Sequence, residues 1–390
     1  MKNPKILYLV RWFGNYKVPV CEELVKLTNN NFHIAYSKDA VTPEVHDNMQ
    51  KRVGNNAIAL EGEKHLIIGS KDSNMSNSYI DIPYQPGILT VIDKVNPDII
   101  ISDGFFQWTV PAVLKSKGRK VCIFYERTAY VERNAQFWRT YSRKLIGRFA
   151  DGFIINGTLT RKYLESMGFG KYPMVEGAMV AAVDDLQSSV ANCADAEIET
   201  IKQKYELNRG GLTYLFVGQL VIRKGIKELL VAWEEHIKNH PNDNILVIGD
   251  GILRQELEER FSTLSSIHII GNVNYSEIYK YYATTDVFIM PTLEDNWSLV
   301  VPEAMACGLP VATTIYNGCY VELIKEGENG YAFDSHNQDS IVDTLSKFHS
   351  DDLKKMGGIS KQIVSNYTPK TAAKIIYEFC VVLTKLNTEK

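Results

Sequence analysis

One stretch, residues 286–314, limits the fold of this chain more than any other. The apolar run 286–290 is typical of a buried parallel strand, and it stops at Pro291. A polar loop follows, and then a short helix that Pro302 begins and Gly308 ends. The next apolar run starts another strand. This stretch is therefore predicted to form a strand–helix–strand unit, the building block of a parallel α/β sheet.

Two acids lie close together in this unit, Asp295 in the loop and Glu303 just inside the helix. Unpaired amides at a helix N-terminus favour a phosphate group. A carboxylate beside them would repel phosphate, but it can accept hydrogen bonds from two neighbouring hydroxyls of a sugar. Both acids could instead only cap and solubilise the helix. Because they occur together with Trp297 and with a strand on each side, we interpret them as a site for a nucleotide-linked sugar.

The pattern Asp295-x7-Glu303, followed by Ala-Met-Ala-Cys-Gly-Leu-Pro-Val, resembles the acid-x7-Glu signature of the group 1 family of retaining, nucleotide-sugar-dependent glycosyltransferases. The family more often has glutamate at the first position, so Asp295 has the same charge on a side chain one methylene shorter. The resemblance is most specific over residues 212–333 and more diffuse over 1–180. It implies an α/β protein of the GT-B fold, with two Rossmann-like, doubly wound domains facing one another across a cleft.

Strand and helix patterns alternate along the chain, which predicts mostly parallel sheets. The strands predicted in the first half are 6–10, 32–36, 65–68, 98–102, 120–124 and 152–155. We predict an N-terminal, Rossmann-like acceptor-binding domain over 1–185, a linker over 186–210, a Rossmann-like donor domain over 211–366 and a final helix within 367–390. In GT-B proteins the last helix crosses back onto the first domain, so the resemblance implies that this helix packs there.

A second loop, after the strand predicted at 212–217, has cations suited to a diphosphate. Arg223 and Lys224 stand just before a helix and are flanked by glycines. An isolated Arg-Lys pair is more often a solvated turn. The family, however, has Gly-Arg-Leu-x-x-x-Lys-Gly here, with both basic residues on the donor phosphates. Lys224 matches the family lysine, Gln219 replaces the arginine, and our hypothesis is that Arg223 partly substitutes for it.

The resemblance also implies a role for each side chain of the site. Glu303 would bind ribose hydroxyls, Asp295 would bind the transferred sugar, and the two cations with nearby amides would stabilise the departing diphosphate. The glycine-containing turn 249–251 could also exist for packing reasons alone. The donor-binding residues that we predict are Gly14, Gln219, Gly249, Arg254, Val273, Asn296, Trp297, Ser298 and Leu299.

Two loops in the first half are candidates for binding the acceptor. Asp103 and the pair Glu126 and Arg127 follow predicted strands, and ligands of open parallel sheets bind at those ends. Glu126 and Arg127 could equally pair with each other or with their neighbours. Family members with so aromatic an acceptor half often extend surface polysaccharides on lipid carriers. These aromatic residues can also be core, which we slightly favour: Trp12, Phe13, Phe105, Phe106 and Trp108.

Composition limits the partners. A net charge of −3 and a pI near 6.3 give no reason to expect nucleic acid. The six cysteines form no C-x-x-C pair, which indicates reduced thiols in a cytoplasmic protein. No apolar run is long enough for a membrane span, so we expect at most peripheral contact with the inner membrane face. His236 and His240 could share a metal, but we interpret them as surface histidines and expect no metal and no cofactor.

We therefore predict a retaining, hexosyltransferase-like glycosyltransferase. It would move a sugar from a nucleoside diphosphate sugar to a glycan or lipid-linked acceptor, in the biosynthesis of surface polysaccharide. One alternative is a catalytically weakened GT-B subunit that only binds sugar nucleotides, which Gln219 and Asp295 favour. Another is a different GT-B enzyme, such as an epimerase.

Overall fold

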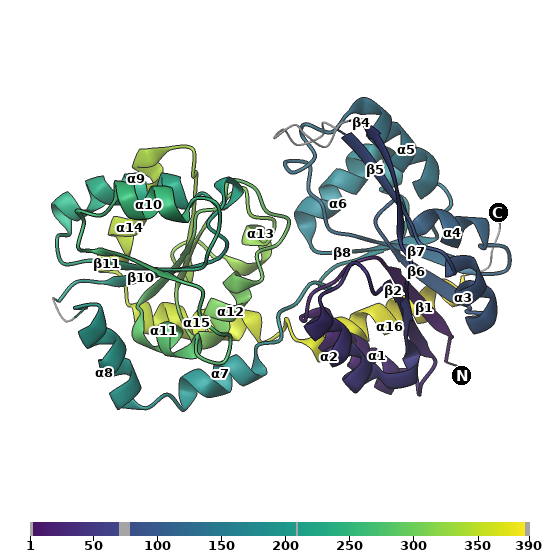
Figure 1. The fold of residues 1–390 in the computed structure, drawn as a ribbon, viewed down its shortest axis with the longest axis horizontal. Coiled ribbons are helices and arrows are strands. Elements are labelled where there is room, and N and C mark those ends of the chain that lie inside the picture. Colours follow the sequence, from purple (N-terminus) through teal and green to yellow (C-terminus); the bar gives the residue numbers. More distant parts are fainter. Residues whose placement is uncertain (1–2, 70–78, 208–209, 387–390) are drawn as a thin grey trace. The chain divides into compact units, whose positions relative to one another are not determined.

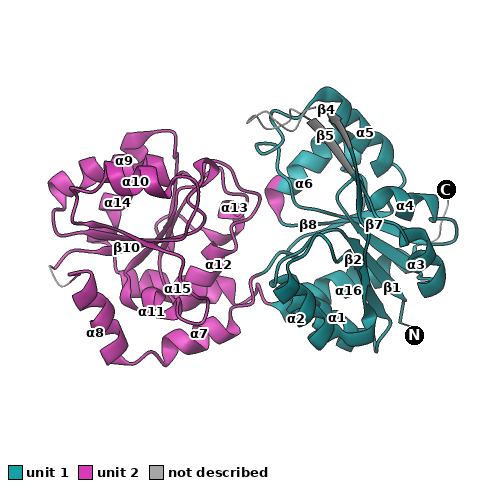
Figure 2. Ribbon diagram, viewed as in Figure 1, with its two compact units in different colours: residues 1–156, 160–180, 369–390 teal, residues 157–159, 181–368 magenta. Residues whose placement is uncertain are grey.

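The computed structural model describes residues 3–69, 79–207 and 210–386. The chain divides into two compact units (Figure 2). Unit 1 comprises residues 1–156, 160–180 and 369–390, and unit 2 comprises residues 157–159 and 181–368. Unit 1 therefore contains both the beginning of the chain and its last helix.

Unit 1 is built on a seven-stranded sheet in which every paired strand is parallel (Figure 1). Its order is β3 (Ala57–Leu60), β2 (Phe32–Ser37), β1 (Ile6–Val10), β6 (Ile99–Asp103), β7 (Lys120–Tyr125), β8 (Gly152–Ile155) and β9 (Met174–Val175). All five residues of β1 are buried, as expected for a sheet with helices on both faces. The direction of strand addition reverses between β1 and β6, and ligands of such sheets bind beyond the strand ends at this point.

The helices of this part of the chain are α1 (Lys17–Leu27), α2 (Pro43–Val53), α3 (Ile88–Val95), α4 (Thr109–Leu114), α5 (Phe137–Gly147), α6 (Thr158–Leu164) and α16 (Pro369–Lys385). The helix α16 packs against α1 and β9. The strand predicted at 65–68 belongs to β4 (Lys64–Gly69), which pairs antiparallel with β5 (Tyr79–Tyr84) in a separate two-stranded sheet. The strand is therefore confirmed, but it lies outside the parallel sheet.

Unit 2 has a six-stranded parallel sheet in the order of a Rossmann fold. The order is β12 (Ile267–Gly271), β11 (Asn244–Ile248), β10 (Thr213–Val217), β13 (Val287–Met290), β14 (Val311–Thr314) and β15 (Gly330–Phe333). Here the reversal lies between β10 and β13. The loop with Arg223 follows β10 and the loop with Asp295 follows β13, so both leave the sheet at the reversal.

The helices of unit 2 are α7 (Asp184–Ala191), α8 (Asp195–Lys204), α9 (Ile226–Asn239), α10 (Arg254–Arg260), α11 (Tyr279–Thr284), α12 (Val300–Cys307), α13 (Tyr320–Leu323), α14 (Gln338–Lys347) and α15 (Leu353–Val364). The predicted linker, 186–210, contains most of α7 and all of α8. Helix α7 packs on α11 and α12, and α8 packs on α11. These two helices thus form a layer of unit 2.

The aromatic residues singled out in the first half are mainly core. Phe13, Phe105 and Trp108 are buried, whereas Trp12 is 54% exposed. All six cysteines are free thiols. Within the described residues, no helix combines the length and the apolar character that crossing a bilayer requires.

Candidate functional site

Two loops at the reversal in unit 2 are joined by hydrogen bonds to the backbone carbonyl of Arg223. The carbonyl of Arg223 accepts from the Leu293 amide at 2.9 Å and from the Thr292 hydroxyl at 2.9 Å. Gly225 has φ of +65°, and a Cβ there would lie 2.0 Å from the Pro291 carbonyl oxygen. Only glycine permits both this conformation and this approach. The short turn before Gly225 is therefore held directly beside the loop that follows β13.

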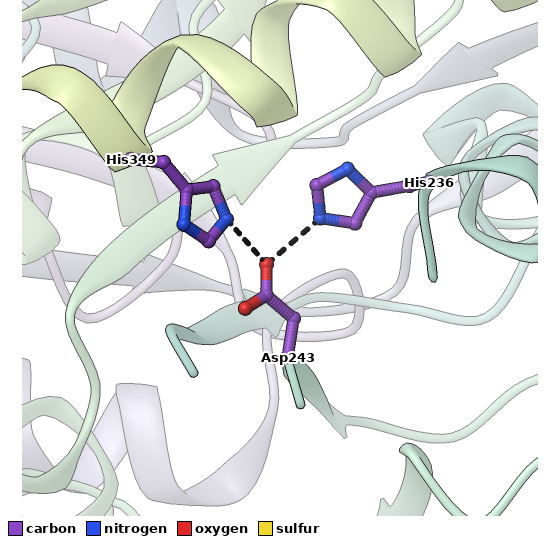
Figure 3. Close-up of side chains that lie close together, drawn as sticks. All are labelled: His236, Asp243 and His349. Atoms are coloured by element: carbon purple, nitrogen blue, oxygen red, sulfur yellow. Dashed lines mark hydrogen bonds and ion pairs between the residues drawn. The ribbon is translucent and has the colours of Figure 1, made fainter. Parts of the chain in front are cut away.

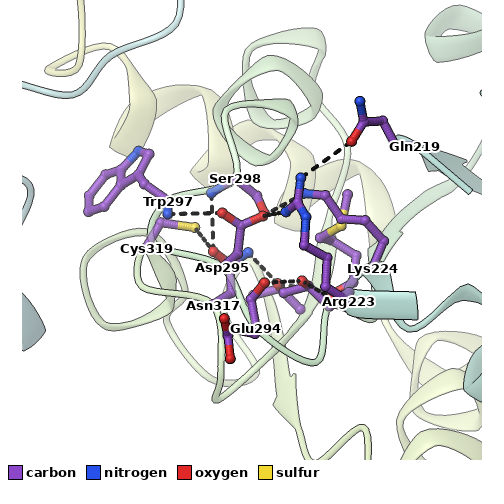
Figure 4. A network of polar contacts seen from close by, with 12 residues as sticks. Gln219, Arg223, Lys224, Glu294, Asp295, Trp297, Ser298, Asn317 and Cys319 are labelled. Atoms are coloured by element: carbon purple, nitrogen blue, oxygen red, sulfur yellow. Dashed lines mark hydrogen bonds and ion pairs between the residues drawn. The ribbon is translucent and has the colours of Figure 1, made fainter. Parts of the chain in front are cut away.

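Asp295 is the centre of the polar network at this place (Figure 4). Its Oδ2 lies 2.5 Å from Lys224 Nζ and accepts a hydrogen bond of 2.7 Å from the Ser298 hydroxyl. Arg223 Nη1 lies farther from the same oxygen, at 3.8 Å, and Arg223 Nη2 donates to Gln219 Oε1 at 3.4 Å. The structure therefore brings together five of the predicted residues, which are 79 positions apart at most in the sequence (219 to 298).

The Asp295 carboxyl is ionised at neutral pH. Burial raises its pKa, but the charge of Lys224 and the hydrogen bonds from Lys224 and Ser298 outweigh burial, and the pKa lies below its ordinary value of 3.8. The side chains of Asp295 and Lys224 are each only 12% exposed. An ionised carboxylate and an ammonium group therefore meet in a largely desolvated position at the strand ends.

The amides before α12 already have intramolecular partners. The Trp297 amide donates to Asp295 Oδ1 at 3.2 Å, and the Ser298 amide donates to Asn317 Oδ1 at 3.2 Å. Asn317 is fully buried in the loop after β14, and the sequence interpretation missed it. An asparagine three residues after a predicted parallel strand was a signal that could have indicated it. The Trp297 side chain is 6% exposed and its ring lies near Tyr367, so it belongs to the core rather than to an open surface.

Glu303 lies in the first turn of α12, in surroundings different from those of Asp295. Its side chain is near Tyr282, and it also raises the pKa of Tyr275. Burial raises the pKa of Glu303 to about 7, although the Tyr282 hydroxyl acts in the opposite direction. No cation acts on Glu303 in the described part of unit 2 strongly enough to offset burial. The two acids of the signature therefore differ: Asp295 is held charged, and Glu303 titrates near neutral pH.

The other predicted donor-binding residues have mainly structural surroundings. Gly249 has φ of +138°, and a Cβ there would lie 1.9 Å from the Gly218 carbonyl oxygen, so packing alone requires glycine. Arg254, the first residue of α10, pairs with Asp250 before the helix at 3.2 Å and with Glu258 on the helix at 2.8 Å. Val273 is partly exposed after β12. Asn296 is partly buried, Leu299 immediately precedes α12, and Gly14 lies before α1 in unit 1, where its Cβ would meet the Tyr16 ring at 3.0 Å.

A second charged cluster lies at the reversal in unit 1, where β1 and β6 are neighbours. Lys17, at the start of α1, is 6% exposed. Its Nζ lies 3.8 Å from Asp103 Oδ1 and 3.7 Å from Glu126 Oε1, and 4.3 Å from the centre of the Phe124 ring. Burial and the charge of Asp103 raise the pKa of Glu126 against the effect of Lys17. The structure thus joins two of the predicted acceptor residues through a lysine that was not predicted.

Arg127 does not belong to this cluster. Its Nη1 donates to Glu132 Oε1 at 2.9 Å, and Glu132 Oε2 also pairs with the buried Arg143 at 2.7 Å. Arg127 therefore pairs with a neighbour other than Glu126, one of the two alternatives left open for it. Its side chain is 48% exposed.

The buried position of Lys17 leads to a first prediction. Lys17→Met should lower the free energy of unfolding by about 2 kcal/mol at pH 8, above the pKa of Glu126, because Asp103 and Glu126 would then face each other without a counter-charge. The loss should be smaller at pH 5, where Glu126, with its raised pKa, is protonated. Urea unfolding at both pH values measures the effect. Lys26→Met on the exposed side of the same helix is the control and should change little. Equal losses in the two variants would contradict the paired state of Lys17.

The interpretation of His236 as a surface residue was wrong, because it is fully buried. The apolar positions of α9 include Trp233, three residues earlier, so helical periodicity could have shown this. His236 Nε2 and His349 Nε2 each lie 2.8 Å from Asp243 Oδ2 (Figure 3). These three atoms could hold a metal ion. However, metal-bound histidines usually donate their other ring N–H, and His236 Nδ1 has no partner among the described residues. We interpret the group as hydrogen bonds that join α9 to the short 3-10 turn 348–350 after α14.

Comparisons with known proteins show what the segment that contains this network is similar to. The family described as glycosyl transferases group 1 matches residues 197–366, which include every residue of the Asp295 network. An uncharacterized glycosyltransferase of Methanocaldococcus jannaschii is 33% identical over 167 residues, 42% of this chain and 40% of the relative. The alpha-monoglucosyldiacylglycerol synthase of Acholeplasma laidlawii is 25% identical over 36% of each chain. The chain thus spans about two fifths of the length of these curated relatives.

Similarity to solved structures extends over nearly the whole chain. HepE of Anabaena, solved in complex with UDP, has a TM-score of 0.75 with 15% identity and covers 97% of this chain and 100% of its own. The lipopolysaccharide outer core galactosyltransferase WaaB has a TM-score of 0.69 with 13% identity, over 97% of this chain and 99% of its own. At such low identity these likenesses concern the fold. Residues 197–366 are therefore similar to the glycosyl transferases group 1 family, and the chain has the GT-B fold of two Rossmann-like domains.

Proposed function

We propose that this protein transfers a glycosyl group from a nucleoside diphosphate sugar to a glycan or lipid-linked acceptor. The observation that carries the proposal is the pairing of the ionised Asp295 with Lys224 at the strand reversal of unit 2. The pair lies inside the segment that matches the glycosyl transferases group 1 family. Strand ends at such a reversal are where ligands of this fold class bind.

The charges of the site side chains determine the role that we assign to each of them. In the transition state, negative charge grows on the departing diphosphate, and fixed cations that meet it there lower the barrier. Lys224 and Arg223 would do this, since an ammonium has three donors and can hold Asp295 and a phosphate oxygen together. Asp295 would then accept hydrogen bonds from the transferred sugar, and Glu303, when ionised, from the ribose diol.

The reaction would proceed with retention at the anomeric carbon. The acceptor hydroxyl oxygen would bond to that carbon on the face from which the diphosphate leaves, and the hydroxyl proton would pass to the departing phosphate oxygen. We expect side-chain cations rather than a metal to neutralise the leaving group. No cofactor is part of the proposal.

The comparisons suggest which substrates to test first. HepE was solved with UDP and with UDP-glucose, which favours a UDP-hexose as donor. The name of the Acholeplasma laidlawii relative indicates a diacylglycerol lipid, which supports a lipid-linked acceptor, as in surface polysaccharide synthesis. Such an acceptor would require the protein to work at the membrane surface, on the cytoplasmic face where sugar nucleotides are found.

A donor screen tests the proposal. The purified chain should release nucleoside diphosphate from one of the common UDP-, GDP- and ADP-sugars, and release should accelerate when a lipid extract is added. Mass spectrometry of the extract should then show one added sugar. An isomerised sugar nucleotide with no transfer would identify an epimerase instead.

A weakened binding subunit is the second candidate. Gln219, in place of the family arginine, is the observation that favours it. Arg223 is the residue expected to substitute for that arginine, but its side chain is half exposed and its Nη1 lies 3.8 Å from Asp295. Such a protein would bind sugar nucleotide in calorimetry but release no nucleotide with any donor. The same screen therefore separates the two candidates.

A further inference from the structure

Helix α5 of unit 1 buries a charged residue and exposes large apolar ones. Its buried residues are Arg143 and Gly147. Arg143 pairs with Glu132 at 2.7 Å and donates to the Tyr163 hydroxyl at 3.1 Å. Gly147 lies against Phe169 so closely that a Cβ would be 2.3 Å from the ring. A helix of a soluble protein normally places its apolar residues on this inner side.

The outer side of α5 is aromatic and aliphatic. Phe137 is 87% exposed and Tyr141, one turn later, is 71% exposed. Leu145 continues the row at 49%, and Phe149, just beyond the helix, is 51% exposed. The spacing of four residues places them in one line along the helix. Figure 1 shows α5 as an outer helix of its unit. An exposed apolar row of this kind usually marks an interaction surface.

The segment around this row is strongly basic, although the whole chain has a net charge of −3. Residues 133–149 include no aspartate or glutamate, and their five basic residues are Arg133, Arg139, Arg143, Lys144 and Arg148. Lys144 and Arg148 are exposed and Arg139 is partly exposed. Within the described residues, none of these three has an acidic partner. Cations therefore flank the aromatic row without being neutralised.

We propose that this outer side of α5 (Phe137, Tyr141, Lys144, Leu145, Arg148 and Phe149) docks on a lipid bilayer that contains anionic headgroups. Aromatic and aliphatic side chains enter the boundary between headgroups and acyl chains, and flanking cations meet the anionic headgroups. A second copy of the chain fits less well, because a symmetric contact would place the same cations opposite each other. The inference extends the proposed function by giving a lipid-linked acceptor a surface at which the enzyme can reach it.

Co-sedimentation with vesicles tests the inference. The full chain should sediment with vesicles of phosphatidylcholine mixed with phosphatidylglycerol, and much less with phosphatidylcholine alone. Phe137→Ser/Tyr141→Ser should weaken binding at least about tenfold. Lys144→Gln/Arg148→Gln should weaken it about 25-fold, since each cation near an anionic surface contributes about fivefold. All four positions are exposed, so these variants should fold.

Matched controls are an exposed apolar residue and an exposed pair of cations elsewhere. Val382→Ser on α16 and Lys354→Gln/Lys355→Gln on α15 should bind vesicles as the unaltered chain does. Failure of the unaltered chain to bind anionic vesicles would overturn the inference, and so would unchanged binding by the α5 variants. A dimer that becomes monomeric in Phe137→Ser/Tyr141→Ser, measured by light scattering without lipid, would assign the surface to a second copy and also overturn it.

Nucleotide release without vesicles keeps this inference separate from the proposed function. The α5 variants should release nucleotide from the sugar donor at the rate of the unaltered chain. Binding to anionic vesicles by a chain that releases no nucleotide would leave the surface assigned and remove the proposed function. Nucleotide release by a chain that does not bind anionic vesicles would support the proposed function and overturn the assignment of the α5 surface.

Discussion

Replacing Lys224 with methionine should reduce the rate of nucleotide release from the sugar donor by about 100- to 1,000-fold, with a much smaller change in KM. This is the range found when one fixed donor to a developing negative charge is removed. Methionine keeps most of the aliphatic stem, so the packing of the turn before α9 should remain. Steady-state kinetics with the donor found in the screen measures the effect. An unchanged turnover number would remove the role of Lys224 at the leaving group.

The same variant should also be less stable, for a reason independent of catalysis. Without Lys224, burial of the Asp295 carboxylate is less well compensated, and its pKa should rise above its present lowered position. We expect a loss of about 2 kcal/mol at pH 7. Because Asp295 has a lowered pKa in the folded chain, its ion pair stabilises the fold above pH 3.8 and stops doing so as pH falls through the folded pKa. The difference between the two chains should therefore disappear in acid.

A double variant separates the two effects. Lys224→Met/Asp295→Asn removes both charges and should recover most of the lost stability, because no unpaired charge stays buried. It should not recover turnover, since the cation at the leaving group and the acid at the sugar are both absent. Recovery of turnover together with stability would mean that the kinetic loss in Lys224→Met was only a folding defect.

These two loops show how far the sequence alone could lead. The strand–loop–helix around Asp295 was predictable, because its apolar run, Pro302 and Gly308 are local signals. The contact between Asp295 and Lys224 was not, since the two residues are 71 positions apart. It depends on β10 and β13 being neighbours, which is a property of strand order. The family pattern placed Lys224 on phosphate, but nothing local indicated that it also pairs with Asp295.

Unit 1 was less predictable for physical reasons. Lys17 lies in the first turn of α1, where the sequence suggests a solvated residue. The pairing of β1 with β6, however, places Asp103 beside it. Helix α2 is mostly polar, so apolar periodicity does not indicate it, and its start depends on the Thr42 hydroxyl, which accepts from the Val45 amide at 3.4 Å. The surface of α5 was missed because aromatic residues in a helix normally indicate a core.

Replacing Glu303 with glutamine should make the protein more stable and its nucleotide binding weaker. Burial raises the pKa of Glu303 from 4.5 to about 7, so the folded chain holds a proton there that the unfolded chain releases. The free energy of unfolding therefore falls as pH rises from 4.5 to 7, and it remains lower above pH 7. A neutral glutamine avoids this loss. At pH 8 the gain should be up to about 3 kcal/mol, and near pH 4.5 it should be close to zero.

Urea unfolding of both chains across this pH range measures the gain. Glu328→Gln is a matched control, because Glu328 is exposed in the turn before β15 and should give no comparable gain. A gain that did not change with pH would show that Glu303 is not desolvated in the folded chain. The prediction concerns the free protein, so it can be tested before any substrate is known.

Nucleotide binding should change in the opposite direction. An ionised carboxylate accepts charge-assisted hydrogen bonds from both ribose hydroxyls, and glutamine offers only one neutral acceptor, so the affinity for UDP at pH 8 should fall about tenfold. In the unaltered chain the affinity should also decrease as pH falls from 8 to 6, since Glu303 becomes protonated. The variant should lack this pH dependence. Equal affinities at pH 8 in calorimetry would remove Glu303 from the ribose. If Glu303→Gln gained stability without losing affinity for UDP, Glu303 would be a buried acid that lowers stability but does not bind the ribose.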